Sequence, residues 1–341
     1  MTSTAWPPAV GARATPDSST LAVVETAAQL LNVIELAHAS GSTDDLGELR
    51  VAVLATPSGR GREQLRAVVA LARGEGLGVS WHEQRVGAAS VARTIRGLLA
   101  ELGGTRRLVV GDSSSEVVQV LVGLVRPTEL TVVDDGTATP ELVREWAGGE
   151  APERWRRPFA GVARLRLFTC LPGDDAVPAG VEVRRNTYAW LKGRWADPEV
   201  RGGVDLLGSA LVESGVVDAE AYLVGVRRLV AKQGVTRYLA HSREPDDRLA
   251  RVRALGVEVV LPGLPLEIEL RRGPVNATLI SFPSAVVHTL PVVLAGTRVL
   301  TLVCDVPDSW YARSVGAAAE AYLRQVTVPT RGGRPMAAAA R

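Results

Sequence analysis

The sequence predicts an α/β protein with two domains, each built on a parallel β-sheet. Short apolar runs alternate with stretches in which apolar residues recur at helical spacing, a pattern typical of parallel sheets covered by helices. The alternation loses its period between residues 186 and 203 and then restarts, and 341 residues are enough for two domains. We therefore expect two Rossmann-like domains that face a central cleft, where a ligand would bind. Their expected bounds are 19–190 and 196–325, with disordered ends at 1–18 and 329–341.

The first half of the chain contains a regular series of expected elements. Apolar runs predict strands at 21–24, 49–55, 78–81, 107–111, 130–133 and 162–168. Helical spacing predicts helices at 26–40, 58–73, 88–102 and 113–124, the last with Ser113 as its N-cap. A further helix is expected to open at Thr139-Pro140-Glu141, because proline suits the first helical turn.

The second half repeats the alternation. Apolar runs predict strands at 204–208, 235–240, 257–261, 277–280 and 299–303. Helical patterns predict helices at 218–232, 245–255, 265–271, 284–295 and 314–323.

Composition excludes several classes of function. The 39 Lys and Arg residues nearly balance the 37 Asp and Glu residues, so the net charge of +2 gives no case for nucleic-acid binding. The two cysteines, Cys170 and Cys304, are far apart in sequence, which argues against a metal cluster or a disulfide framework. We see no signal peptide in the first 19 residues and no apolar stretch near the ~20 residues of a membrane-spanning helix. We therefore expect a cytoplasmic protein.

One loop leaves a peripheral membrane contact open. The segment Glu153-Arg-Trp-Arg-Arg157 combines a tryptophan with three arginines. Such a loop suits an anionic acceptor or the inner face of a membrane, or it is a solvated loop with one buried tryptophan.

Polar residues follow three of the expected strands directly. They are Asp134-Asp135-Gly136, His241-Ser242-Arg243-Glu244 and the turn from Ser281 to Ser284. In open α/β sheets, ligands bind outside the carboxyl ends of the strands. These three stretches are therefore the candidates for a functional site.

The acidic tripeptide has two interpretations. Neighbouring carboxylates at Asp134 and Asp135 raise the pKa of one of them, which suits a general base. The alternative is an ordinary turn between a strand and a helix, since Asp and Gly136 are common turn residues. Taken alone, the tripeptide favours the turn.

The other two stretches suit an anion. His241 at a strand end can donate a hydrogen bond to a phosphate oxygen, while Arg243 either pairs with Glu244 or binds an anion itself. Ser281 and Ser284 precede an expected helix, and a helix N-terminus with nearby hydroxyl groups binds anions. Taken alone, the serine turn is equally an ordinary helix cap.

Further polar residues have weaker assignments. Glu25, Gln29 and Asn32 share one face of the first expected helix, where they either contact a sugar or form its solvated side. Glu267 either lies near a nucleotide ribose or is a carboxylate at a helix N-terminus. The chain lacks a full dinucleotide fingerprint, a phosphate-binding P-loop and a nucleophile elbow.

Together, the three motifs resemble those of the bacterial sialyltransferases of glycosyltransferase family 52 and the related polysialyltransferases. The shared features are the D/E-D-G tripeptide, a strand-terminal histidine and a serine-containing turn, in this order. The opening Val23-Val-Glu-Thr-Ala-Ala-Gln29-Leu-Leu-Asn32 also resembles the family's first strand and helix. The resemblance covers roughly residues 20 to 305.

The resemblance implies a GT-B fold and an inverting transfer of sialic acid from CMP-sialic acid to a glycan hydroxyl, with no metal and no cofactor. It implies Asp135 as the general base and His241 as the group that assists the departing CMP phosphate. The remaining roles that it implies are phosphate binding by Ser281 and Ser284, and approach to the donor by Gly208 and Ser209.

One departure from the family bears on the donor. Ser242 stands where the family usually has proline after the histidine, which relaxes the backbone and leaves the imidazole in place. Two other hypotheses therefore stay open. The same scaffold can use CMP-Kdo or a UDP-sugar, or it can bind a nucleotide or glycan without catalysis.

Overall fold

A computed structural model of the chain describes residues 19–41, 46–55, 59–83, 88–102, 105–113, 115–134, 162–171 and 180–312. The chain divides into two compact units, Met1–Trp190 and Leu191–Arg341. The division falls inside the segment where the sequence pattern loses its period. Several predictions lie outside the described residues: both disordered ends, Asp135 and Gly136, the helix at Thr139, the loop 153–157 and the helix 314–323.

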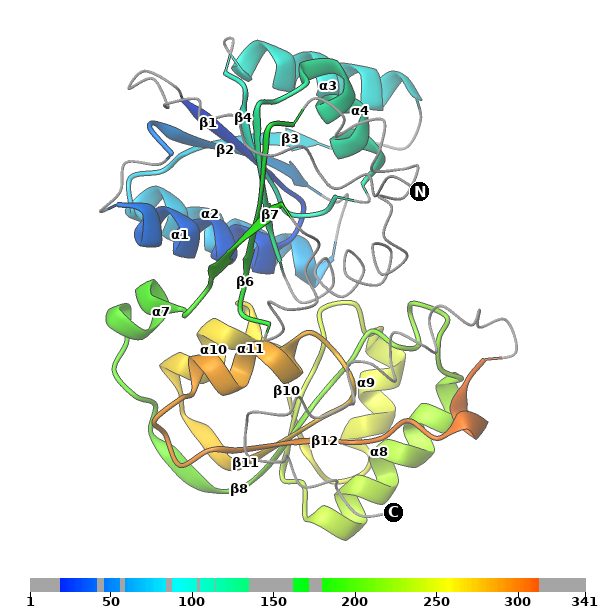
Figure 1. The fold of residues 1–341 in the computed structure, drawn as a ribbon. Helices are drawn as coiled ribbons and strands as arrows, with labels where there is room; N and C mark the ends of the chain where they lie inside the picture. The colour runs from blue at the N-terminus through cyan, green and yellow to red at the C-terminus, as the bar shows by residue number, and fades with distance from the viewer. Residues whose placement is uncertain are drawn as a thin grey trace, which may run out of the picture. The chain divides into compact units, whose positions relative to one another are not determined.

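The described part of unit 1 contains a seven-stranded parallel sheet (Figure 1). Its strand order is β3-β2-β1-β4-β5-β6-β7. The bounds are β1 Thr20–Val24, β2 Leu49–Ala55, β3 Gly78–Glu83, β4 Arg107–Val110, β5 Glu129–Val133, β6 Arg164–Thr169 and β7 Val181–Arg185.

Helices cover both faces of this sheet. Figure 1 shows α1 and α2 on one face and α3 and α4 on the other. Leu21 and Val23 of β1 belong to a buried cluster with Leu98 of α3 and Leu121 of α4. Burying each such side chain contributes roughly 1.5–3 kcal/mol, so this layer is a main source of stability. The helices are α1 Ala27–Ser40, α2 Arg60–Gly74, α3 Ala88–Leu102 and α4 Glu116–Val125.

The described part of unit 2 contains a five-stranded parallel sheet with the order β10-β9-β8-β11-β12. Figure 1 shows α8 and α9 on one face and α10 and α11 on the other. The strands are β8 Val200–Leu207, β9 Arg237–Leu239, β10 Glu258–Val260, β11 Val275–Ser281 and β12 Leu300–Val303. The helices are α8 Ala219–Gln233, α9 Asp246–Arg253, α10 Leu266–Arg272, α11 Val286–Val293 and the 3-10 helix Asp308–Trp310.

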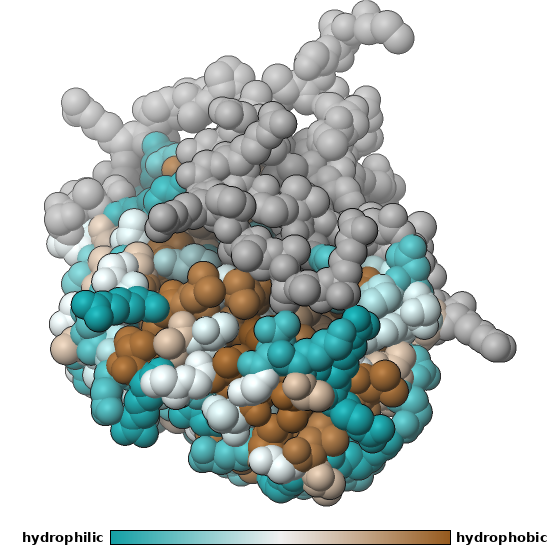
Figure 2. Space-filling view, turned by 90° about the horizontal axis from the view of Figure 1, so that it is seen from below, coloured by the Kyte–Doolittle hydropathy of each residue, from teal (hydrophilic) through white to brown (hydrophobic). Residues whose placement is uncertain are grey.

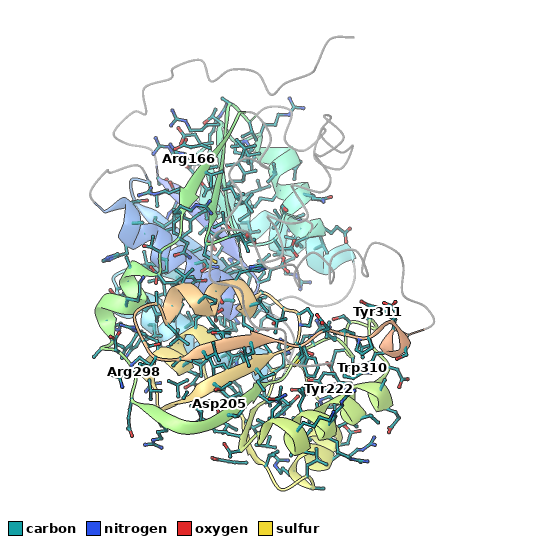
Figure 3. All side chains as sticks on the ribbon, turned by 60° about the horizontal axis from the view of Figure 1, so that its bottom comes forward. Arg166, Asp205, Tyr222, Arg298, Trp310 and Tyr311 are labelled. Atoms are coloured by element: carbon teal, nitrogen blue, oxygen red, sulfur yellow. The ribbon has the colours of Figure 1, made fainter. Side chains whose placement is uncertain are left out.

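The segment after β12 returns to α8. The backbone N–H of Asp218 donates to the carbonyl of Trp310 at 2.8 Å, and the Trp310 ring lies against Gly225, where a Cβ would come within 1.8 Å of it. Figure 3 shows Tyr222 of α8 near Trp310. Phe282 connects the two rings, with its centroid 4.9 Å from that of Tyr222 and 6.1 Å from that of Trp310.

The structure confirms the fold class, and several elements differ from the sequence prediction. A strand at Val181–Arg185 and a short helix, α7, at Ala189–Arg194 were not predicted. The edge strand pairs on one side only and is half exposed, so its sequence carries charged residues instead of an apolar run. Helix α4 begins at Glu116 with Ser115 at the N-cap position, so Ser113 is not its cap.

Surface apolar residues of unit 2 are spread over several elements. The large exposed ones are Val224 on α8, Leu261 after β10 and Leu300 on β12. On the face that Figure 2 shows, apolar residues lie among hydrophilic ones. None of the described helices is long and apolar enough to cross a membrane.

Chain order reverses once in each sheet. In unit 1 the reversal lies between β1 and β4, and in unit 2 it lies between β8 and β11. In doubly wound α/β sheets, the crevice at such a reversal is where ligands bind, outside the carboxyl ends of the strands. A ligand site is therefore expected at the carboxyl ends of β1 and β4 in unit 1 and of β8 and β11 in unit 2.

Candidate functional site

Three adjacent strands of unit 2 end in the residues that the sequence predicted for the donor side. Gly208 and Ser209 follow β8, His241 and its neighbours follow β9, and Ser281 ends β11. Strand β8 pairs with β9 on one side and with β11 on the other, so all three ends lie together at the chain reversal. The structure thereby brings together residues that lie more than 70 positions apart.

A buried chain of hydrogen bonds connects these strand ends. The Tyr238 hydroxyl donates to Oε1 of Glu244 at 2.6 Å and lies 2.9 Å from the Tyr222 hydroxyl. The Tyr222 hydroxyl accepts from the backbone N–H of Ser209 at 3.2 Å. At the other end, Oε2 of Glu244 accepts from the backbone N–H of His241 at 2.7 Å. Glu244 therefore ties the end of β9 to α8 and, through it, to the end of β8.

Gly208 makes room for this chain. A Cβ at this position would lie 2.2 Å from Oε2 of Glu244, 2.8 Å from the His241 nitrogen and 2.9 Å from the Tyr238 hydroxyl. Real Cβ atoms do not approach other atoms so closely. The close passage of the β8 end over Glu244 therefore requires glycine.

Burial determines the protonation of Glu244. Its side chain is only 1% exposed. Burial raises the pKa of the carboxyl to about 7, while the hydrogen bonds from Tyr238 and His241 act in the opposite direction. Burial also raises the pKa of the Tyr238 hydroxyl, which stays a donor at neutral pH.

The hydrogen bonds of His241 favour one tautomer of the ring. The backbone N–H of Arg243 donates to Nδ1 at 3.1 Å. A neutral imidazole that accepts at Nδ1 carries its proton on Nε2, which is then a hydrogen-bond donor. The Arg243 side chain is exposed, and its guanidinium donates to the Glu213 carbonyl at 3.4 Å.

The serine turn does not cap α11. Ser281 is buried, and its Oγ donates to the Phe282 carbonyl at 2.7 Å and lies 3.4 Å from the Oγ of Ser284. Ala285 occupies the N-cap position, and no side chain caps this end. The first bond of the turn runs from the N–H of Val287 to the Ser284 carbonyl, and the N–H groups at the start of a helix are the kind of donors that bind anions.

Ser209 has a buried hydroxyl at the end of β8. Its side chain is 2% exposed, and its Oγ has no hydrogen-bond partner among the described residues. A buried hydroxyl without a partner costs roughly 1–3 kcal/mol. A ligand that formed a hydrogen bond with this hydroxyl would offset that cost.

Glu267 lies on the opposite face of the unit 2 sheet. Its carboxylate is buried between α10 and α11, where Oε1 accepts from Oγ1 of Thr289 at 2.6 Å. Burial raises the pKa of this carboxyl. It belongs to the first turn of α10, as the helix-terminus interpretation requires, and the contact with a ribose stays a prediction.

Three of the predicted residues of unit 1 hold its framework. Gln29 forms a capping box with Thr26 at the start of α1. The Nδ2 of Asn32 donates to the Asp134 carbonyl at 2.9 Å, and its Oδ1 accepts from Asn186 at 3.0 Å. The Asp134 carboxylate is buried and accepts from Oγ1 of Thr169 at 2.8 Å. Glu25 differs from these residues, because its carboxylate accepts a hydrogen bond from the Ser115 hydroxyl.

The sequence prediction missed the two tyrosines of the unit 2 network. Tyr238 is part of an apolar run, and Tyr222 lies on the buried face of α8. A signal was present, because a buried tyrosine hydroxyl usually needs a hydrogen-bond partner and Glu244 is near in sequence. Among the described residues, no three or more His, Cys, Asp or Glu side chains form a group that suits a metal ion.

Comparison with known proteins gives a fold and no family. No protein-family model matches the chain, and no curated protein matches its sequence. A putative UDP-N-acetylglucosamine 2-epimerase from Listeria monocytogenes is similar in structure, with a TM-score of 0.53 and 14% identity over 90% of this chain and 86% of that chain.

Two further structures are similar. A UDP-GlcNAc 2-epimerase from Neisseria meningitidis, bound to UDP-GlcNAc, has a TM-score of 0.53 and 12% identity over 91% of this chain and 89% of that chain. The GT-B domain of a Photobacterium damselae sialyltransferase has a TM-score of 0.46 and 10% identity over 90% of this chain and 96% of that chain. At these identities the epimerases show the fold alone, which is GT-B-like with two Rossmann-like domains.

Proposed function

We propose that this chain is an inverting glycosyltransferase that moves sialic acid from CMP-sialic acid to a glycan hydroxyl. One observation carries the proposal. Ser209, His241 and the turn at Ser281 end three adjacent strands at the chain reversal of unit 2. The order of the motifs in the sequence supports the sialic acid donor, and the fold supports a nucleotide-sugar enzyme.

Unit 2 binds the donor. The phosphate of CMP accepts hydrogen bonds from the N-terminal N–H groups of α11, from Ser281 and Ser284, and from the buried Oγ of Ser209. His241 donates from Nε2 to the departing phosphate, and Glu244 holds the His241 backbone in place. Fixed donors at the point where charge develops lower the barrier without a metal ion. Gly208, Arg243 and Glu267 complete the donor side.

Unit 1 supplies the acceptor side, and one of its carboxylates accepts the proton of the acceptor hydroxyl. The sequence motif points to Asp135, flanked by Asp134 and Gly136, for this step. Glu25 lies on this acceptor side, whereas Gln29 and Asn32, which the sequence also assigned to it, hold the framework of unit 1. We place this reaction in the cytoplasm, with peripheral contact at the inner membrane face where the acceptor is a lipid-borne glycan.

A UDP-sugar is the second candidate donor. The two similar structures with a TM-score of 0.53 are UDP-GlcNAc 2-epimerases, one of them bound to UDP-GlcNAc. The phosphate-binding residues would serve either nucleotide, so selection between CMP and UMP must come from contacts with the base.

The deciding experiment measures the thermal stability of the full chain with CMP, UMP, GDP or NAD. A ligand that binds only the folded state at one hundred times its Kd stabilises by about 2.7 kcal/mol. We expect CMP to stabilise selectively, and Ser281→Ala to reduce the effect. Ser214→Ala, which changes an exposed serine, is the matched control and should leave the stabilisation by CMP unchanged.

Each outcome decides between the candidates. Selective stabilisation by UMP would show that the donor is a UDP-sugar and not CMP-sialic acid. Stabilisation by CMP without turnover of CMP-sialic acid in the presence of glycans favours a non-catalytic binding protein. No response to any nucleotide overturns the proposed donor site.

A further inference from the structure

Glu25 lies at the chain reversal of the unit 1 sheet. It follows β1 directly, and β1 pairs with β4 on the side where the order reverses. Asp112 and Ser115 follow β4 at the same edge of the sheet. Ligands bind in such a crevice, so Glu25 is placed where a substrate of unit 1 would be expected.

The side-chain amides of Gln29 and Asn32 form hydrogen bonds within the framework of unit 1. Oε1 of Gln29 accepts the backbone N–H groups of Glu25 at 2.8 Å and of Thr26 at 3.3 Å. Gly111 leaves room for this side chain, since a Cβ there would lie 2.4 Å from that same oxygen. Gln29 thus fixes the backbone from which the Glu25 side chain projects.

The carboxylate of Glu25 is used differently. Oε1 accepts from the Ser115 hydroxyl at 2.5 Å, which ties it to the residue at the start of α4. The residue is partly buried, and among the described residues no hydrogen bond reaches Oε2. One oxygen is therefore anchored and the other is available to a substrate hydroxyl.

We infer that Glu25 is the general base that accepts the proton of the acceptor hydroxyl. This inference rests on the proposed transfer. The acceptor O–H bond breaks, its proton passes to Oε2 of Glu25, and the acceptor oxygen forms a bond to the anomeric carbon. The bond from that carbon to the donor phosphate breaks with its electron pair, and the nucleotide leaves as the phosphate anion.

The electrostatics of Glu25 suit this role. Burial raises the pKa of its carboxyl, the Ser115 hydrogen bond lowers it, and the charge of Asp112 raises it. A base works best when its pKa is close to the operating pH. Asp112 is the charged group that acts on it from the β4 side.

Asp135 is then not the general base. Its tripeptide alone favours a turn between strand and helix, and only the family resemblance makes it a base. With Glu25 as the base, Asp135 does not accept the proton of the acceptor hydroxyl. Turnover should therefore be lost on substitution of Glu25 and kept on substitution of Asp135, whereas the family resemblance predicts the reverse.

The first experiment compares substitutions in the full chain. Turnover of CMP-sialic acid and of UDP-GlcNAc is measured with lactose as acceptor. We expect Glu25→Gln to lower turnover ~100-fold or more, the usual contribution of a general base, with nucleotide stabilisation unchanged. Glu83→Gln, an exposed carboxylate on β3, is the matched control and keeps wild-type turnover. Turnover within about twofold of wild type in Glu25→Gln, or full loss only in Asp135→Asn, overturns the inference.

The second experiment moves the acidic limb of the pH–rate profile in both directions. Ser115→Ala removes a bond that lowers the pKa of Glu25, so the limb shifts to higher pH. Asp112→Asn removes a charge that raises that pKa, so the limb shifts to lower pH. If Glu25 has only a structural role, the acidic limb stays in place in both variants, and that result overturns the inference. If neither donor is turned over by the wild type, the transferase proposal fails first, and the role of Glu25 fails with it.

Discussion

Two carboxylates that lie near strand ends, one in each sheet, are used in different ways. Glu25 follows β1 of unit 1 and Glu244 lies just after β9 of unit 2, and burial raises the pKa of both. Glu244 accepts hydrogen bonds on both oxygens from its own chain, whereas Glu25 accepts a described bond on one. The two carboxylates differ in their hydrogen bonds and not in the direction of their pKa shift: Glu244 holds a loop, whereas Glu25 has one oxygen for a substrate.

The largest expected effect is the pH dependence of stability through Glu244. Its folded-state pKa of about 7 lies above the ordinary value of 4.5, so between these values the folded chain holds a proton that the unfolded chain has released. The free energy of unfolding therefore falls as pH rises through this window, by at most about 3 kcal/mol. Urea unfolding between pH 4.5 and 7.5 gives the free energy of unfolding of the wild type and of Glu244→Gln. The difference between the two pH profiles isolates Glu244, because the other carboxyls with a raised pKa, Glu25 and Glu267, are present in both proteins. Equal slopes would contradict it.

The glycines next to the two carboxylates give the second comparison. Gly208→Ala places a methyl group against the Glu244 carboxylate and the His241 backbone, so we expect a loss of about 1–3 kcal/mol and weaker binding of CMP. Gly111→Ala meets only the side chain of Gln29 and no backbone atom, so we expect it to cost less, although it displaces the acceptor of the Glu25 and Thr26 N–H groups. Gly123→Ala, a helical site with no atom nearby, is the control. Equal losses at positions 208 and 111 would contradict the difference between the two sites.

Ser209 tests whether the unit 2 site is built for a ligand. Ser209→Ala removes a buried hydroxyl without a described partner, so the ligand-free chain should gain about 1 kcal/mol in stability. The same change should weaken CMP binding roughly tenfold, the effect of one lost hydrogen bond to a charged group. Calorimetric titration and thermal unfolding measure the two effects. A loss of stability without a loss of affinity would make Ser209 part of the scaffold.

The smallest expected effect is at Tyr238. Tyr238→Phe removes the donor to Oε1 of Glu244 and should destabilise the chain by about 1 kcal/mol. Because that bond lowers the pKa of Glu244, its loss should extend the fall in stability to a higher pH. Tyr222→Phe, which instead deprives the Ser209 N–H of its acceptor, should disturb nucleotide binding more. A pH profile unchanged by Tyr238→Phe would remove Tyr238 from the network.

The sequence by itself determined the fold class and the strand ends that matter. Apolar runs and helical spacing are local patterns, so strands such as 49–55 and helices such as 88–102 appear in the structure where they were predicted. Position at the end of a strand is also a local property. His241 and Ser281 could therefore be nominated before the topology was known, because parallel strands all present their carboxyl ends to one edge.

Only the tertiary structure decided how the polar residues are used. Glu25, Gln29 and Asn32 look equivalent on one helix face, yet Asn32 is bound to a residue 154 positions away and Glu25 to one 90 positions away. The half-exposed edge strand Val181–Arg185 likewise became visible only through its pairing with β6. Hydrogen-bond partners and neighbouring strands far along the chain leave no periodic signal in the sequence, because they meet only when the sheets form.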